Sequence, residues 1–254
     1  KKDLISIIIP YHKKKKFFQE TISSINRQSY KSFEVIIIYD DDDKSELNYV
    51  KKLIRKYKKK NSHVIVNQHN IGAGRSRNKG IKLAKGKMIA FCDADDIWKK
   101  DKLKYQIEFM KKNNIHFSHC GYDIIDSNSK VIGSFLPKNI LKFNDLIKSC
   151  DIGLSTVILN KKILKKFSFS SLKTKEDYLL WLRVIKYLKV FYGIKSKLVL
   201  WRKTENSLSS SIYQKLIDAF RLYKIHMKYN FFLSLFLVIR LVFFAFKKKI
   251  FIYL

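Results

Sequence analysis

The first half of the chain alternates uninterrupted apolar runs with stretches in which apolar residues recur every three or four positions. Short runs rich in β-branched residues predict buried strands, and the wider spacing predicts amphipathic helices. The predicted strands are Leu4–Ile9, Phe33–Ile38, Val64–Val66 and Met88–Cys92, and the predicted helices are Phe17–Gln28, Glu46–Lys60, Gly72–Ala84 and Leu103–Asn113. Because the strands are apolar at nearly every position, both faces should be covered, as in a parallel sheet. The alternation therefore predicts an α/β fold with a doubly wound, Rossmann-like, mostly parallel sheet.

The pattern loosens after about Phe117, where the predicted elements are less regular. They are the strands Ser118–Ile125, Val131–Phe135, Ser155–Leu159 and Lys197–Trp201, and the helices Leu141–Lys148 and Asp177–Leu188. The polar segment Arg202–Ser211 predicts a mobile loop at the end of this region. We therefore expect one domain over residues 1–212, in two halves that meet near residue 117, and a tail over residues 213–254.

The tail is basic and rich in aromatic residues. Tyr213–Lys228 has helical spacing, and Phe231–Phe246 is apolar apart from Ser234 and Arg240. Sixteen residues with an internal arginine fall short of the about 20 that span a bilayer. Such a helix is typical of one that lies in the membrane interface, so we expect a membrane-associating tail. A helix packed on the protein and a true membrane span are the alternatives.

The chain is strongly basic, with 53 Lys and Arg residues against 21 Asp and Glu residues and a net charge of +32. Either this reflects a general bias towards lysine, isoleucine and asparagine, or it attracts the chain to a polyanion such as nucleic acid or an anionic membrane. The lysines are dispersed and no recognised nucleic-acid-binding motif occurs, so we do not expect a nucleic-acid partner.

The remaining composition excludes several classes of protein. A hydrophobic content of 46% excludes a disordered chain. The three cysteines are far apart and form no C-x-x-C motif, which argues against a disulfide scaffold and a zinc site. The same cysteine pattern fits a reducing compartment. The sequence runs from Lys1-Lys2-Asp3 into a predicted strand, so we expect no signal peptide.

The most informative chemical feature is the acidic cluster that follows the predicted strand Met88–Cys92. Asp93, Asp95 and Asp96 lie within four positions, and such a cluster repels itself unless a cation or hydrogen bonds neutralise it. Carboxylate oxygens at a strand end suit Mg²⁺ or Mn²⁺, and these ions suit a diphosphate. The alternative is a solvated acidic turn that caps the next helix.

Four motifs occur in a fixed order along the chain. They are Ser6-Ile-Ile-Ile-Pro-Tyr-His12, Phe33-Glu-Val-Ile-Ile-Ile-Tyr-Asp-Asp41, the segment from Asn70 to Asn78 that leads to Asp93-Ala-Asp-Asp96, and Lys175-Glu-Asp-Tyr-Leu-Leu-Trp-Leu-Arg183. Together they resemble the nucleotide-sugar glycosyltransferases of family two, which share the GT-A fold. The resemblance covers about residues 4–211. It implies that residues 1–117 form the nucleotide-binding half and residues 118–212 the acceptor-binding half.

The resemblance also implies a nucleotide site, in which Gly72 and Gly74 would shape a loop and Arg77 or Arg75 would offset negative charge. Asp40 would accept a hydrogen bond from a uracil-type base. The implied nucleotide-binding residues are Pro10, Tyr11, His12, Asp40, Arg77 and Asp93. The chain departs from the family by carrying His12-Lys13 in place of Tyr-Asn, and Asp41-Asp42-Asp43 in place of Gly-Ser.

The implied catalytic residues lie in the two acidic motifs. Asp95 would bind Mn²⁺ or Mg²⁺ directly, and Asp93 would contact the ribose or the water shell of the metal. Asp177 would be the general base that takes a proton from the acceptor hydroxyl. The residues implied at the sugar or acceptor are Asp96, Trp98, Glu176 and Trp181, with core packing as the alternative for both tryptophans and a local hydrogen bond for Asp96.

A last implied feature is closure of Arg202–Ser211 over the diphosphate, with Arg202 as the clamp. The expected function is inverting transfer of a sugar from a nucleoside-diphosphate sugar, most naturally a UDP-sugar, to a glycan or lipid-linked acceptor in bacterial surface polysaccharide synthesis. We expect the protein at the cytoplasmic face of the inner membrane, bound through residues 213–254, or in the cytoplasm. The alternatives are a nucleotidyltransferase, a charge-driven nucleic-acid-binding protein and an inert sugar-nucleotide-binding relative.

Overall fold

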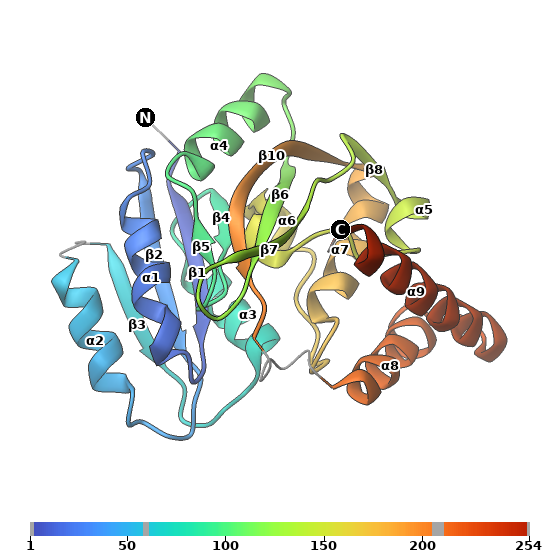
Figure 1. The fold of residues 1–254 in the computed structure, drawn as a ribbon, viewed down its shortest axis with the longest axis horizontal. Helices are drawn as coiled ribbons and strands as arrows, with labels where there is room; N and C mark the ends of the chain where they lie inside the picture. Colours follow the sequence, from blue (N-terminus) through green and yellow to red (C-terminus); the bar gives the residue numbers. More distant parts are fainter. Residues whose placement is uncertain (1–2, 58–60, 205–210, 253–254) are drawn as a thin grey trace.

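In the computed structural model, which describes residues 3–57, 61–204 and 211–252, ten strands form one sheet with helices on both faces (Figure 1). The strand order is β3-β2-β1-β4-β9-β6-β10-β5, with β7 on β6 and β8 on β10. The strands are β1 Ile5–Tyr11, β2 Phe33–Tyr39, β3 Ser62–Val66, β4 Met88–Phe91, β5 Ile97–Trp98, β6 Phe117–Ile125, β7 Val131–Phe135, β8 Ile140–Lys142, β9 Ile158–Asn160 and β10 Val190–Arg202.

The first four strands confirm the predicted parallel half of the sheet. β1 pairs in parallel with β2 and β4, and β2 pairs in parallel with β3. The carboxyl ends of these strands therefore meet at one edge of the sheet, the lower edge in Figure 1. The segments that follow the four strands, and that carry the implied nucleotide and metal residues, converge there.

The second half of the sheet is mixed rather than parallel. β9 lies antiparallel between β4 and β6, whereas β6 and β10 are parallel. The predicted helix Leu141–Lys148 is wrong at its start, because Leu141 pairs with Phe191 in a strand and the helix is only α5, Phe143–Leu146. The predicted strand Ser155–Leu159 is also wrong at its start, where the 3₁₀ turn η1 occupies Leu154–Thr156.

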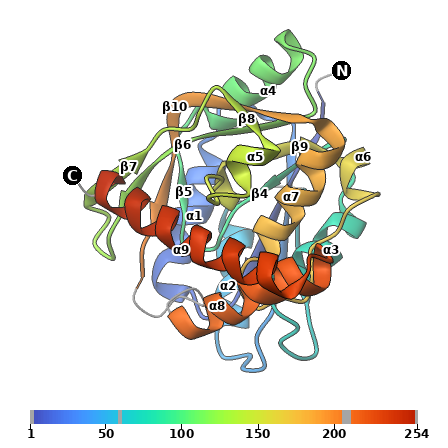
Figure 2. The same ribbon diagram turned by 90° about the vertical axis from the view of Figure 1, so that its right-hand side faces the viewer.

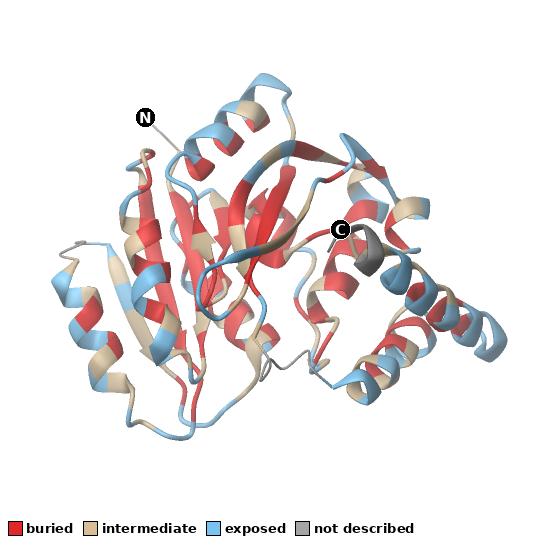
Figure 3. Cartoon of the chain, viewed as in Figure 1, coloured by how far each residue is buried: buried red, intermediate tan, exposed pale blue. Residues whose placement is uncertain are grey.

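Two hydrophobic cores lie on opposite faces of the sheet (Figure 3). Successive side chains of a strand point to opposite faces, so Ile7 belongs to one core and Ile8 to the other. The core with Ile7 packs against α1 Lys15–Asn26, α2 Leu47–Lys56 and α4 Lys102–Lys112. The core with Ile8 packs against α3 Ala73–Leu83, α5, α6 Lys161–Leu164 and α7 Glu176–Leu188. The end of the predicted helix Glu46–Lys60 lies outside the described residues.

The tail consists of α8 Ile212–Arg221, the π-helical turn η2 Leu222–His226 and α9 Phe231–Ile252. Both helices lie on the side of the molecule where α7 lies (Figures 1 and 2). The inner side of α8, η2 and α9 belongs to the core that holds Ile8, through Ala219, Leu222, Tyr223, Leu237, Val238 and Leu241. Within residues 3–57, 61–204 and 211–252, no helix combines the length and apolar character that crossing a bilayer requires.

Candidate active site

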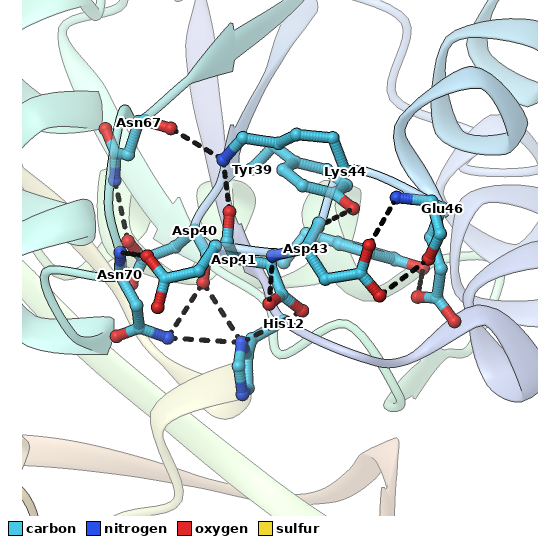
Figure 4. Close-up of polar contacts among 12 residues, drawn as sticks. His12, Tyr39, Asp40, Asp41, Asp43, Lys44, Glu46, Asn67 and Asn70 are labelled. Carbon is cyan, nitrogen blue, oxygen red and sulfur yellow. Dashed lines mark hydrogen bonds and ion pairs between the residues drawn. The ribbon is translucent and has the colours of Figure 1, made fainter.

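One corner of the candidate site is built around the carboxylate of Asp40, directly after β2 (Figure 4). Its Oδ1 accepts hydrogen bonds from Asn67 Nδ2 and from the backbone N–H of Ile71, both at 2.8 Å. The Asp40 carbonyl accepts a third hydrogen bond from Asn70 Nδ2 at 3.0 Å and lies 3.1 Å from His12 Nδ1. Two residues that follow β3 therefore fix the orientation of this carboxylate, while His12 and Asn70 contact the backbone of Asp40.

The acidic run after Asp40 is largely held by local contacts. Asp41 is buried, and its Oδ2 lies 3.3 Å from His12 Nδ1. Lys44 Nζ donates to the carbonyls of Asp41 and Asn67. Asp43 accepts hydrogen bonds from the backbone and hydroxyl of Ser45, which hold the pKa of Asp43 below its usual range. Asp40 is therefore distinguished from Asp43 by side-chain hydrogen bonds to residues that follow a neighbouring strand, β3.

Tyr11 does not present its ring to this corner. It follows the alternation of Ile5, Ile7 and Ile9 along β1 and is fully buried. Its ring stacks on Tyr39 with centroids 5.3 Å apart, and its hydroxyl donates to Glu46 at 2.5 Å. The geometry therefore does not support the implied contact between the Tyr11 side chain and a nucleotide. The half-buried Pro10 also lies within β1, beside Ile38 of β2.

Two glycines shape the loop that leads into α3. Gly72 has a φ of +86°, a conformation that L side chains rarely adopt. A Cβ on Gly74 would lie 2.7 Å from the carbonyl of Ser170 and 3.1 Å from Glu176 Cγ. This close approach brings the start of α3 against the segment that precedes α7. Arg75 points outward and is exposed, whereas Arg77 is buried.

Arg77 joins the two acidic motifs. Its Nη1 lies 2.7 Å from Glu176 Oε1, and its Nη2 lies 2.8 Å from Asp93 Oδ1. The Arg77 side chain is only 5% exposed, whereas that of Asp93 is 34% exposed. Charged hydrogen bonds in a poorly solvated site are stronger than those in water. The arginine therefore fixes the end of β4 against the start of α7, although the two motifs are far apart in sequence.

The Glu176–Asp177 pair begins α7. Burial and the neighbouring Asp177 charge raise the pKa of Glu176 to about 7, and Arg77 opposes this rise. Burial also raises the pKa of the half-buried Asp177, whose Oδ1 accepts the backbone N–H of Tyr178 at 2.7 Å. A carboxylate with a raised pKa is a better base near neutral pH than an ordinary one.

The raised pKa of Glu176 makes a prediction about stability. A carboxyl group with a raised pKa stabilises the fold fully below its usual pKa of 4.5, and this stabilisation is lost as the pH rises through about 7. We expect wild type to lose stability relative to Glu176→Gln across that range, measured by urea unfolding at a series of pH values. The exposed Glu108→Gln is the control. Parallel curves for wild type and Glu176→Gln would contradict the prediction.

The three aspartates after β4 have different surroundings. Asp93 is partly exposed beside Arg77, and its backbone N–H donates to Ser155 Oγ at 2.9 Å. Asp95 is buried, with its Oδ2 2.6 Å from Lys14 Nζ. Burial raises the pKa of Asp95, and the Lys14 charge opposes this rise.

Asp96 is fully buried, and its Oδ1 accepts the backbone N–H of Arg202 at 2.9 Å. Burial, and then the charges of Asp95 and Asp93, raise its pKa well above the usual range. Of the two implied roles for Asp96, the geometry matches the local hydrogen bond rather than contact with the sugar.

Arg202 is not placed as a diphosphate clamp. Its side chain is fully buried and donates to the carbonyls of Asp95 and Asp126, to Ser129 Oγ and to Glu20 Oε2, at 2.8–3.1 Å. These bonds hold the strand end in place. Most of the segment implied to close over the diphosphate, residues 205–210, lies outside the described residues.

The two tryptophans implied at the sugar or acceptor belong to the core. Trp181 is fully buried and packs edge-on against Phe117, with centroids 5.3 Å apart. Trp98 is 2% exposed, and Lys102 Nζ lies 4.0 Å from its ring centroid. Neither ring presents a surface to a ligand, so core packing is the alternative that the structure favours for both.

The structure adds residues that the motifs did not indicate. Asn67 follows β3, and its place after a parallel strand is a signal that could have found it. The sequence does not single out Lys14, which is one of four consecutive lysines, or Ser155, which has no distinctive neighbours. Asp218 of α8 accepts hydrogen bonds from the backbone and hydroxyl of Thr174 at 2.8 and 3.0 Å. The tail thereby braces the segment just before Glu176 and Asp177.

Comparison with known proteins gives consistent results. A family model described as glycosyl transferase family 2 matches residues 6–170. The Escherichia coli protein WfgD, named as a UDP-Glc:alpha-D-GlcNAc-diphosphoundecaprenol beta-1,3-glucosyltransferase, is 36% identical over 217 residues, which cover 84% of this chain and 82% of WfgD. TuaG of Bacillus subtilis (strain 168), named as a putative teichuronic acid biosynthesis glycosyltransferase, is 31% identical over 214 residues and 83% of each chain.

A solved structure also shares the fold. The crystal structure of S. aureus TarS in complex with UDP-GlcNAc matches with a TM-score of 0.67 at 20% identity, covering 92% of this chain and 70% of that chain. At this level of identity the likeness shows the architecture alone.

Proposed function

This chain belongs to glycosyl transferase family 2, and from that membership we propose that it transfers a sugar from a nucleoside-diphosphate sugar to a hydroxyl group. The observation that carries the proposal is the Arg77 bridge, which holds the Asp93 and Glu176 motifs at one edge of the sheet. Asp40 lies at the same edge, after β2. Neighbouring segments thus carry the residues to which we assign the nucleotide contact, the metal ion and the general base.

The donor is proposed to be a UDP-sugar, bound by residues 1–117. Asn67 and Ile71 use Oδ1 of Asp40, which leaves Oδ2 for an N–H of the base. The partly exposed Asp93 is assigned to the ribose or to the water shell of the metal. The name of WfgD specifies UDP-Glc as its donor, which supports the choice of nucleotide.

The acceptor is proposed to be a lipid-linked glycan, bound mainly by residues 118–212. The name of WfgD specifies a diphosphoundecaprenol-linked acceptor, and that of TuaG specifies teichuronic acid biosynthesis. Both suit a role in bacterial surface polysaccharide synthesis at the cytoplasmic face of the inner membrane. Glu176, held by Arg77 beside Asp177, is assigned to orienting the reacting groups.

Asp177 is proposed as the general base of a single displacement that inverts the anomeric carbon. Its carboxylate is half-buried at the start of α7, where burial raises its pKa. It takes the proton from the acceptor hydroxyl as the hydroxyl oxygen bonds to the anomeric carbon and the nucleoside diphosphate departs with its bonding electrons. The reaction needs no covalent intermediate with the enzyme.

Asp95 and Asp93 fit an Mn²⁺ or Mg²⁺ ion that also binds the diphosphate. In residues 3–57, 61–204 and 211–252, no three His, Cys, Asp or Glu side chains gather as a metal site. Mg²⁺ at substrate phosphates typically takes only one or two protein carboxylates, so two aspartates are enough. In the structure, Asp95 Oδ2 pairs with the Lys14 ammonium group instead. When bound there, the ion would neutralise charge on the departing diphosphate.

A donor screen tests this function. Purified protein with a lipid-linked acceptor is incubated with several nucleotide sugars, with Mn²⁺ or with EDTA, and release of nucleoside diphosphate is measured. We expect metal-dependent release from a UDP-sugar and at least a hundredfold loss in Asp95→Asn, because the metal supplies several kcal/mol of transition-state stabilisation. The exposed Asp101→Asn is the control. Equal activity in the two variants, or no transfer from any donor, would refute the proposal.

The tail is proposed to dock on an anionic membrane. The side of α8, η2 and α9 that faces away from the core exposes a series of large apolar residues: Ile212, Tyr213, Leu216, Ile225, Phe231, Phe232, Leu233, Leu235, Phe236, Ile239, Val242, Phe243 and Phe246. The exposed Arg221, Lys224 and Lys247 lie on the same elements, and the exposed Lys228 lies between η2 and α9. An apolar helix face accompanied by basic residues suits the interface of an anionic bilayer.

Two phenylalanines on α9 test the docking. Phe232 is 82% exposed and Phe243 is 62% exposed, so replacing both by Glu should not unfold the protein. We expect at least a tenfold loss in flotation with phosphatidylglycerol vesicles, because each buried Phe side chain contributes about 1.5–3 kcal/mol. Leu83 and Tyr105, also exposed but on α3 and α4, are replaced by Glu in the control. Unchanged flotation of the α9 variant would contradict this interface.

A further inference from the structure

Lys14 places a positive charge on the carboxylate that we assign to the metal. Its Nζ lies 2.6 Å from Asp95 Oδ2 and 3.5 Å from Thr204 Oγ1. Lys14 follows β1, Asp95 follows β4 and Thr204 follows β10. The Lys14 side chain is 24% exposed and that of Asp95 only 12% exposed. The ammonium group therefore lies inside the site, where three strands end.

The neighbouring lysines do not share this position. Lys13, Lys15 and Lys16 are exposed, and the last two lie against the rings of Tyr49 and Phe17. Lys13 has a φ of +48°, in the left-handed region. The chain turns sharply there, from the end of β1 into α1, and Lys14 is the residue between the turn and the helix. The inward direction of Lys14 is thus a feature of this loop rather than of a lysine-rich surface.

The charges of the site suggest what this ammonium group does. Arg77 is shared by Asp93 and Glu176, and Lys14 pairs with Asp95. A divalent cation and the diphosphate of a nucleotide sugar bring equal and opposite charges, so their arrival leaves the net charge of the site unchanged. A bound metal would, however, take over Asp95, and Lys14 would then need a new anion in a poorly solvated place. A phosphate oxygen is a suitable partner for the ammonium group of a lysine, which is compact and strongly charged.

We propose that Lys14 is a diphosphate-binding residue of the donor site, held at Asp95 until the donor and the metal arrive. This inference rests on the proposed function, because the anion is the diphosphate of the donor. It assigns to Lys14 a contact that the four motifs do not include.

Calorimetric titration of the full chain with UDP and with uridine, in EDTA and in Mn²⁺, tests the inference. Uridine lacks the diphosphate, so it reports whether the base site is intact. We expect Lys14→Met and Lys14→Gln to bind UDP about tenfold more weakly or worse, and uridine within twofold of wild type. Lys13→Met, which removes the neighbouring exposed charge, should bind both ligands within twofold. Electron paramagnetic resonance without nucleotide should show tighter Mn²⁺ binding by Lys14→Met than by Lys13→Met, because Lys14 no longer competes at Asp95.

The outcomes separate this inference from the proposed function. UDP and uridine affinities that fall together in both Lys14 variants, or a UDP affinity that matches Lys13→Met, would overturn the diphosphate contact even if sugar transfer is intact. A selective loss of UDP binding in a chain that transfers no sugar would support the contact and refute the glycosyltransferase activity instead.

Discussion

Replacing Asp177 by Asn is expected to lower sugar transfer by about 10²–10⁴-fold, the usual contribution of a general base, while donor binding stays unchanged. The side chain is half-buried, and its Oδ1 already accepts the backbone N–H of Tyr178. An Asn oxygen can accept that same bond, so the start of α7 should keep its structure. What the variant loses is the second carboxylate oxygen and the ability to take a proton.

The measurement is the initial rate of transfer at saturating donor, together with calorimetric affinity for UDP. Asp145→Asn is the matched control, because it also removes a carboxylate from the first turn of a helix, α5. In wild type, activity should fall towards acid pH as the base becomes protonated, with a midpoint above the usual Asp pKa because burial raises the pKa of Asp177. If Asp177→Asn keeps more than a tenth of wild-type activity, another group is the base.

The sequence pattern predicted the half of the fold that brings the nucleotide residues together. Continuous apolar strands separated by helices indicate parallel pairing, and parallel pairing alone brings the ends of β1, β2 and β4 to one edge. Asp40 and Asp95 could therefore be placed near each other without a structure. The strand order of the second half could not be predicted, because β9 pairs antiparallel with β4 and β10 pairs with β6. Nothing in the periodicity of a short strand specifies its neighbour.

Side-chain direction was the weaker part of the prediction, even where the element was right. Tyr11 lies on the same face of β1 as Ile5, Ile7 and Ile9, so the period of two along β1 could have placed it in their core. Trp181 lies on a helix that is apolar nearly all round, which indicates a core helix rather than a ligand surface. Arg202 offers no such signal, because its partners come from Glu20 and from loops distant in sequence.

The tail shows a further limit of sequence patterns. The apolar stretch Phe231–Phe246 suggested one surface, but α9 has two: Leu237 and Leu241 pack on the domain, while Phe232 and Phe243 are exposed. The contact of the buried Asp218 could not be predicted either, because its partner Thr174 is far away in sequence. Through Asp218 and the inner side of α9, the tail thus packs on the domain and supports the segment that precedes Glu176 and Asp177.

Arg77→Met is expected to cost about 3–5 kcal/mol of stability, because removing one partner of a buried ion pair leaves uncompensated charge behind. Glu176 and the Oδ1 of Asp93 would both lose the cation that now lies within 2.8 Å. The loss of Arg77 should raise the pKa of Glu176 further, because the Arg77 charge now opposes that rise. Carboxyls with raised pKa values favour the folded state at low pH, so the stability deficit should grow as the pH rises towards neutral.

A double variant separates this charge effect from lost packing. Met keeps much of the arginine stem but not the guanidinium group, whose Cζ lies 5.5 Å from the ring centroid of Phe169. Arg77→Met/Glu176→Gln also removes one of the carboxylates left without a cation. We expect the second substitution to restore part of the stability lost by Arg77→Met, measured by urea unfolding at pH 5 and pH 8. Transfer activity should stay low in both variants, because the end of β4 and the start of α7 are no longer tied together. A deficit that is independent of pH and unrelieved by Glu176→Gln would mean that Arg77 acts through packing, and that the two acidic motifs are positioned by other contacts.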